Sequence, residues 1–227
     1  MVGYAVTVYD IARELPDIET LRRRCRALAM LSAIFQPDND HRFYRYTGKW
    51  RPGADVATMA SGGGDSSWVV FEPAGVYIQG FDHESAMSPY AADEMATWPG
   101  VVDSVPEVFR KYLTEPAFLL DGVPAATACL WREITDDQWR TGTIEFPESG
   151  YGDVDGAGYL FGMLTGSAED CQNWAGDYYA YEVDIDAVRA VLSLQPLTPE
   201  LVATLNPEAD LAVLGKDVDA IGYPRHP

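Results

Sequence analysis

The stretch that decides the fold is SSWVVFEPAGVYIQGFD, residues 66–82. Two runs rich in β-branched and aromatic residues are separated by Pro73, Ala74 and Gly75, which is typical of a β-hairpin with a tight connection. We therefore expect strands over 66–73 and 75–82. Residues 68–71 form a continuous apolar run, which predicts that the first of these strands is central and covered on both faces.

Helices and further strands are predicted on both sides of this hairpin. Apolar residues recur at three- and four-residue steps in the helical segments, and suitable helix caps are Asp17, Ser104, Ser167, either Asp184 or Asp186, and Thr198. We expect helices over 18–36, 105–113 and, in short pieces, from about 156 onward, and strands over 42–47, 54–60, 66–73, 75–82, 124–132 and 139–147, with an irregular end from about Asn206. This order predicts an α+β fold in one domain, 1–227, whose antiparallel or mixed sheet has helices packed mainly on one face.

Composition excludes several classes of protein. Hydrophobic residues make up 47% of the 227 residues, which is enough for a buried core and argues against a disordered chain. No stretch approaches the roughly 20 apolar residues that span a bilayer. The first residues lack the pattern of a signal peptide, and Cys25, Cys129 and Cys171 do not suggest a disulfide framework, so we expect a cytoplasmic protein. Arginine outnumbers lysine thirteen to three, a bias typical of GC-rich bacterial genomes.

The net charge is −19, and it is unevenly distributed. Residues 1–113 hold 11 basic and 15 acidic side chains, whereas residues 114–227 hold 5 and 20. Such a surface repels nucleic acid and anionic membranes, so neither is expected as a partner. The charge either keeps the protein dispersed in solution or attracts a basic protein partner.

The segment Asp82-His83-Glu84 is the best candidate for acid–base chemistry. A histidine titrates near neutral pH, and neighbouring carboxylates can orient it. The alternative is a histidine that is hydrogen-bonded within a turn. Only three histidines exist, at 41, 83 and 226, so we expect no metal site, and no sequence pattern indicates a cofactor. The glycine-rich loop at 62–64 lacks the lysine of a phosphate-binding loop and is interpreted as a turn.

A partner-binding edge is expected around a second predicted hairpin. Trp131 and Trp139 flank a polar loop that contains Asp136 and Asp137, and exposed tryptophan is common at protein interfaces. Core packing of both tryptophans is the alternative. A second acidic loop contributes Asp153 and Asp155 to the same expected surface. Asp155 is also placed to cap the helix that follows it.

The hairpin from Gly64 to Glu84, with the helix predicted over 105–113, resembles the SUKH group of bacterial immunity proteins. The resemblance implies a non-catalytic protein that binds and blocks a cognate toxin. Together with the acidic second half of the chain, it favours an immunity-protein-like module that binds a basic protein. An enzyme of unknown reaction, with its site at Asp82, His83 and Glu84, is the alternative.

Overall fold

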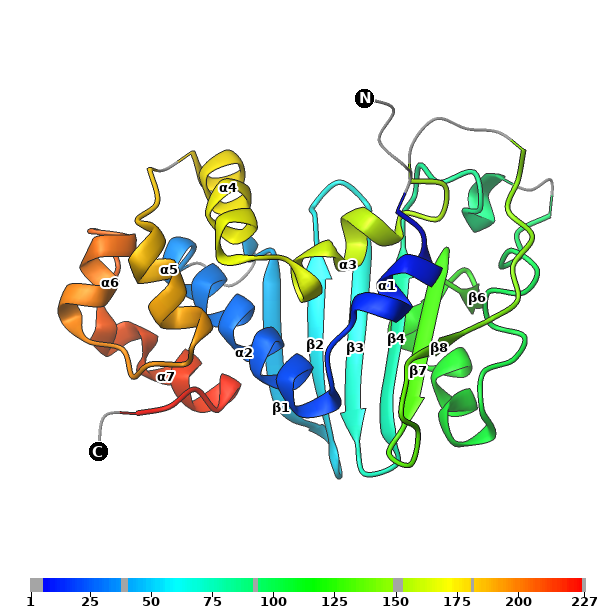
Figure 1. Ribbon diagram of the computed structural model, residues 1–227, viewed down its shortest axis with the longest axis horizontal. Coiled ribbons are helices and arrows are strands. Elements are labelled where there is room, and N and C mark those ends of the chain that lie inside the picture. The colour runs from blue at the N-terminus through cyan, green and yellow to red at the C-terminus, as the bar shows by residue number, and fades with distance from the viewer. Residues whose placement is uncertain (1–5, 38–40, 92–93, 149–152, 181, 226–227) are drawn as a thin grey trace. The chain divides into compact units, whose positions relative to one another are not determined.

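The computed structural model describes residues 6–37, 41–91, 94–148, 153–180 and 182–225, and the fold is α+β (Figure 1). The chain divides into two compact units. The first, called the sheet unit, comprises Met1–Ile18 and Met59–Thr165, and the second, called the helical unit, comprises Glu19–Thr58 and Gly166–Pro227. The expectation that the whole chain is one domain stays a prediction.

The main sheet has six strands in the order β1-β2-β3-β4-β7-β8. All the strand pairs of the sheet unit from β3 to β8 are antiparallel, so the predicted antiparallel sheet is confirmed. The strands of this sheet are β1 (Tyr44–Arg51), β2 (Ala54–Ala60), β3 (Ser66–Glu72), β4 (Gly75–Phe81), β7 (Ala128–Glu133) and β8 (Arg140–Thr141). A separate two-stranded ribbon pairs β5 (Leu119–Leu120) with β6 (Val123–Pro124).

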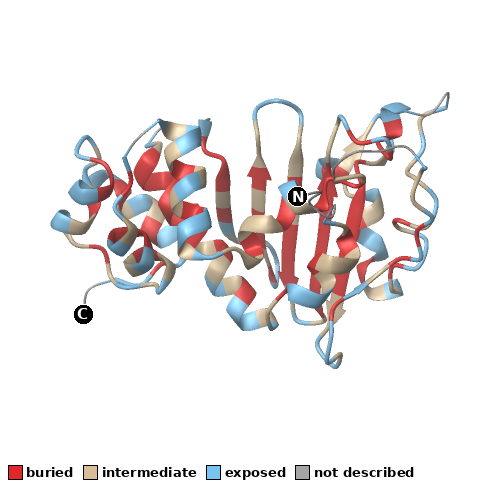
Figure 2. Ribbon diagram, turned by 45° about the horizontal axis from the view of Figure 1, so that its top comes forward, coloured by how far each residue is buried: buried red, intermediate tan, exposed pale blue. Residues whose placement is uncertain are grey.

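The β3–β4 hairpin has the turn that the sequence predicts, with Glu72 paired to Gly75. Gly75 has a φ of +141° and lies so close to the next strand that a Cβ there would be 2.1 Å from the carbonyl oxygen of Arg132. Only glycine fits this position. Every residue of β4 is buried, and its neighbours β3 and β7 are buried over more than half of their residues (Figure 2). The hairpin therefore forms the centre of the core.

The two faces of β4 are covered by different kinds of helix. Tyr77 stacks on Tyr112 of the 3-10 helix η3 (Glu107–Thr114), with ring centroids 5.2 Å apart. Gly80 points the other way, where an added Cβ would lie 2.5 Å from Phe161 of α3 (Ala157–Thr165). Helix α1 (Val8–Glu14) packs beside α3 (Figure 1). In this unit the α-helices thus occupy one face, as predicted, and 3-10 helices η3 and η4 (Pro116–Phe118) cover the other.

The helical unit contains most of the long helices. Ser167, Asp184 and Thr198 accept the hydrogen bonds that cap three of these helices, as the sequence predicts. Asn206 is buried, and its side-chain amide donates to the carbonyl of Ile34 at 2.8 Å. The helices are α2 (Ile18–Phe35, whose first residue belongs to the sheet unit), α4 (Ala168–Tyr179), α5 (Ile185–Leu192), α6 (Pro199–Leu205) and α7 (Leu211–Ile221).

Four expectations about individual elements were wrong. Helix α1 was not expected, and α7 replaces the irregular end predicted from Asn206. Asp210 and Gly222 cap α7, so its signals were present in the sequence. The helix predicted over 105–113 is the 3-10 helix η3, and 124–132 contains two separate strands.

The strand predicted over 139–147 is also shorter than expected, because it leaves the sheet after Thr141. Beyond that point, the hydroxyl of Tyr9 makes hydrogen bonds with backbone groups that a neighbouring strand would otherwise pair. It donates to the carbonyl of Gly142 at 3.0 Å and accepts from the N–H of Ile144 at 2.8 Å. A tertiary contact thus replaces strand pairing.

Among the described residues, no helix combines the length and the apolar composition needed to cross a bilayer.

Candidate functional site

Two aspartates and a histidine meet at one end of the β3–β4 hairpin. Ser66 pairs with Phe81, so the residues just outside that pair, Asp65 and Asp82, lie at the same end of the two strands. His83 follows directly, where β4 has ended and the chain turns. Local strand pairing therefore brings together residues that are 17 and 18 positions apart in the sequence.

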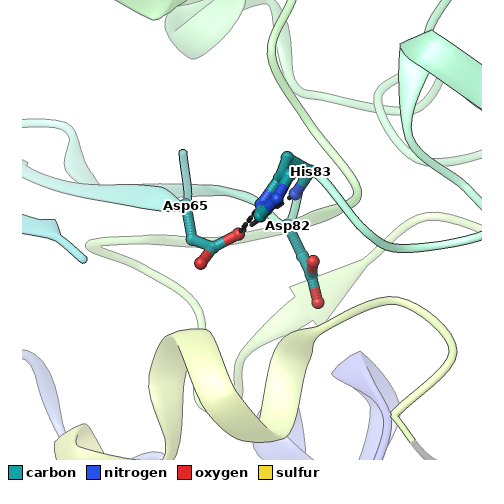
Figure 3. Close-up of side chains that lie close together, drawn as sticks. All are labelled: Asp65, Asp82 and His83. Atoms are coloured by element: carbon teal, nitrogen blue, oxygen red, sulfur yellow. Dashed lines mark hydrogen bonds and ion pairs between the residues drawn. The ribbon is translucent and has the colours of Figure 1, made fainter. Parts of the chain in front are cut away.

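His83 is held by Asp65 through two contacts (Figure 3). Its ring nitrogen Nδ1 lies 2.6 Å from Asp65 Oδ1, and its backbone N–H donates to the same oxygen at 3.2 Å. Ser61 donates its hydroxyl to the other oxygen, Oδ2, at 3.0 Å. The histidine side chain is 37% exposed, so the ring is oriented by a carboxylate while part of it faces solvent.

These contacts shift the pKa of both partners. The hydrogen bond to Asp65 raises the pKa of His83 above its usual value. Burial by itself would raise the pKa of Asp65, but the hydrogen bonds from His83 and Ser61 outweigh it and lower that pKa. At neutral pH the pair therefore favours an ionised Asp65 and increases the protonated fraction of His83.

Asp82 lies beside this pair in a different environment. Its Oδ1 accepts the N–H of Glu84 at 2.9 Å, and its own N–H donates to Thr127 Oγ1 at 3.2 Å. Burial, followed by the negative charge of Asp65, raises the pKa of Asp82. Glu84 is exposed, and its Oε1 lies 4.0 Å from His83 Nε2.

The predicted segment Asp82-His83-Glu84 thus lies in a turn after the strand. The partner that orients His83 is Asp65, which directly precedes the opposite strand, β3. Sequence reasoning missed Asp65 as a site residue. The hairpin register could have indicated it, because a turn at 73–75 places 65 opposite 82.

Asp155, predicted for a binding surface, is fully buried. Its two carboxylate oxygens accept the N–H of Val8 at 2.8 Å and the N–H of Ala157 at 3.0 Å. The latter contact places Asp155 next to the start of α3, where the carbonyl of Gly156 accepts the first backbone hydrogen bond of the helix. Burial raises the pKa of Asp155 to about 7, and the nearby Asp153 adds to that rise. Asp153 is partly buried.

The tryptophans predicted to flank a binding edge lie in the core. Trp131 is 3% exposed and pairs with Tyr77 across the sheet, and Trp139 is 5% exposed and donates its indole N–H to the carbonyl of Pro16 at 2.7 Å. Core packing, the alternative interpretation, is what the structure shows. Asp136 is engaged by Arg140 at 3.3 Å, and Asp137 is exposed. Of the six residues predicted to bind a partner, Trp131, Trp139 and Asp155 lie too deep to form a surface.

The segment after Gly166 combines many exposed carboxylates with few basic residues. The segment 166–225 has only three basic residues, Arg189, Lys216 and Arg225. Within it, every acidic residue except Asp217 is exposed: Glu169, Asp170, Asp177, Glu182, Asp184, Asp186, Glu200, Glu208, Asp210 and Asp219. These ten residues are called the acidic helical surface below.

Comparison with known proteins found no match to a family model, a curated protein or a solved structure. The resemblance to SUKH immunity proteins therefore stays a prediction.

Proposed function

We propose that the protein binds a basic protein partner through the acidic helical surface. The single observation that carries this proposal is the exposure of almost every carboxylate in the segment 166–225, against three basic side chains. Carboxylates concentrated in this way create a field that speeds encounter with a positively charged protein and disfavours nucleic acid.

Ion pairs and helix caps within the segment already engage some of these carboxylates. Fewer carboxylates therefore remain available for contact with a partner. Arg189 pairs with Glu169 and Asp186, and Arg225 pairs with Asp219. Asp184 and Asp210 cap helices, Asp170 accepts the N–H and the hydroxyl of Ser167, and Glu200 is hydrogen-bonded to Thr198. Asp177, Glu182 and Glu208 are exposed and belong to none of these groups, so these three carboxylates are the best candidates for contact with a cationic partner.

The resemblance of the Gly64–Glu84 hairpin to SUKH immunity proteins supports a toxin as the partner. On this proposal the protein blocks its partner by occupancy and performs no reaction. Binding of this kind is expected to weaken steeply as salt concentration rises, because the contacts between exposed charges are screened.

The test is capture of the partner from the native organism, followed by affinity measurements with two matched triple variants. One variant carries D177N, E182Q and E208Q in the helical unit. The control carries D121N, D137N and E148Q in the sheet unit and changes the net charge equally. We expect the first to weaken binding at least tenfold and the control to change it little. Equal weakening by both variants would mean that only net charge matters, and weakening by the control alone would place the interface on the sheet unit.

A second candidate function is acid–base catalysis by His83. The 2.6 Å contact between His83 Nδ1 and Asp65 favours it, because a carboxylate at one ring nitrogen orients the other for proton transfer. A panel of chromogenic ester and phosphate substrates tests it, with His83→Gln against His41→Gln as the control. Turnover that His83→Gln abolishes and His41→Gln preserves would support catalysis, and turnover that survives in both variants would exclude His83.

A further inference from the structure

The cluster of Asp65, Asp82 and His83 has the donor atoms of a metal site. Each side chain offers one ligand atom, and the three atoms lie within 4.8 Å of one another. The donors are two carboxylate oxygens and one imidazole nitrogen, and their residues lie just beyond the paired ends of β3 and β4. This rigid pairing fixes their separation before any ligand arrives.

The cluster also has more negative charge than its described neighbours balance. Lysine or arginine makes no described ion pair or hydrogen bond with Asp65, Asp82 or Asp153, and His83 is the only basic partner in the described contacts. The mutual repulsion of Asp82 and Asp153 is among the effects that raise the pKa of Asp153, after burial.

One carboxylate oxygen beside the cluster is left without an N–H or hydroxyl donor. Asp153 Oδ1 is buried and accepts no hydrogen bond from a described N–H or hydroxyl group, and the carboxyl group of Asp155 is the side chain that interacts with Asp153. An unpaired carboxylate oxygen in a partly buried site is costly, and a bound cation would offset that cost.

We propose that Asp65, Asp82 and His83 bind a divalent first-row metal ion. A mixed set of imidazole and carboxylate ligands suits Mn²⁺ and Zn²⁺ better than Ca²⁺ or Mg²⁺, which prefer oxygen alone. The order of divalent affinities predicts tighter binding of Zn²⁺ than of Mn²⁺. The sequence expectation of no metal site rested on the number of histidines, whereas this site needs only one.

Binding requires an imidazole nitrogen that carries no proton. Because His83 shares a proton with Asp65, metal binding at neutral pH releases protons in proportion to the protonated fraction of His83.

The experiment is calorimetric titration of the tag-free full chain with ZnCl₂ and MnCl₂. It is repeated in two buffers of different ionisation enthalpy so that proton release can be counted. We expect one ion per chain, and a loss of affinity of at least tenfold in both Asp82→Asn and His83→Gln. His41→Gln and Asp137→Asn are the controls and should bind as the original chain does. Circular dichroism and thermal unfolding show that each variant is folded.

Electron paramagnetic resonance of Mn²⁺ gives an independent count of bound ions. No binding at one ion per chain, or equal binding in Asp82→Asn, His83→Gln and the original chain, would overturn the proposal. The metal site does not rest on the basic-partner proposal. Measuring partner affinity with and without a chelator separates the two, because partner binding can persist when the metal is removed and can fail while the metal stays bound.

Discussion

Asp155 and Val8 are joined by a hydrogen bond although 147 positions separate them in the sequence. The carboxylate Oδ2 of Asp155 accepts the backbone N–H of Val8, the first residue of α1, at 2.8 Å. Its other oxygen accepts the N–H of Ala157, the first residue of α3. One buried carboxyl group thus ties the starts of two neighbouring helices together on the sheet.

This arrangement predicts that acidic conditions stabilise the sheet unit through Asp155. Its pKa is about 7 in the folded chain and near 3.8 when exposed, so the folded state binds more protons between these values. The free energy of unfolding should therefore fall as pH rises from about 4 to about 7, by on the order of 3 kcal/mol. In Asp155→Asn the free energy of unfolding should depend less on pH, as measured by chemical unfolding across the same pH range.

Asp137→Asn, at an exposed position, is the matched control and should leave the slope as it is. An unchanged slope in Asp155→Asn would mean that other groups, such as Asp153, carry the pH dependence.

The hydrogen bond between Asp65 and His83 predicts a measurable pKa change. Asp65→Asn removes the negative charge that favours the imidazolium form, so the pKa of His83 should fall toward or below 6.5, the usual value of histidine. Nuclear magnetic resonance of the ring resonances measures it, with His41 as the internal reference. If the His83 pKa stays the same in Asp65→Asn, the 2.6 Å contact does not control its charge.

Because α3 packs closely on the sheet, replacing Gly80 or Gly162 by alanine should have opposite effects on stability. A Cβ at Gly80 would lie 2.5 Å from Phe161 and 2.9 Å from Leu160, so Gly80→Ala should destabilise the chain by about 1–3 kcal/mol. Gly162 lies in α3, and apart from the adjoining backbone of that helix and its two chain neighbours no atom is within 4 Å of such a Cβ, so Gly162→Ala should stabilise the chain by roughly 0.5–1 kcal/mol. Thermal unfolding compares the two, and a stable Gly80→Ala would show that α3 can move away from β4.

Gln79 is predicted to be a structural residue of the core. Its amide nitrogen donates to the carbonyls of Phe118 and Ala125, at 2.9 and 2.8 Å, and Tyr77 donates its hydroxyl to the amide oxygen at 2.7 Å. Gln79→Met keeps the length but leaves these groups unpaired, at a cost of about 2–4 kcal/mol. Gln138→Met, at an exposed position, is the control for chemical unfolding. Equal stability of the two variants would mean that water replaces the lost contacts.

Several features of the fold follow from local sequence. The β3–β4 hairpin was predicted from its apolar runs and from the Pro73–Gly75 turn, and the caps Ser167, Asp184 and Thr198 from their spacing. Such signals act over a few residues, so they can be interpreted without knowledge of the rest of the chain. The sequence likewise determined the −19 charge and its concentration after residue 113.

Only the tertiary structure decided which polar residues meet. Asp82 and His83 were recognised from the sequence, but Asp65 became a partner through the strand register, and the unpaired Asp153 oxygen lies on a different loop. Trp131 and Trp139 show the same limit, because a tryptophan beside a polar loop is compatible both with an interface and with the edge of a core. Burial depends on which distant segments pack against a residue, and that information lies in long-range contacts that no local pattern contains.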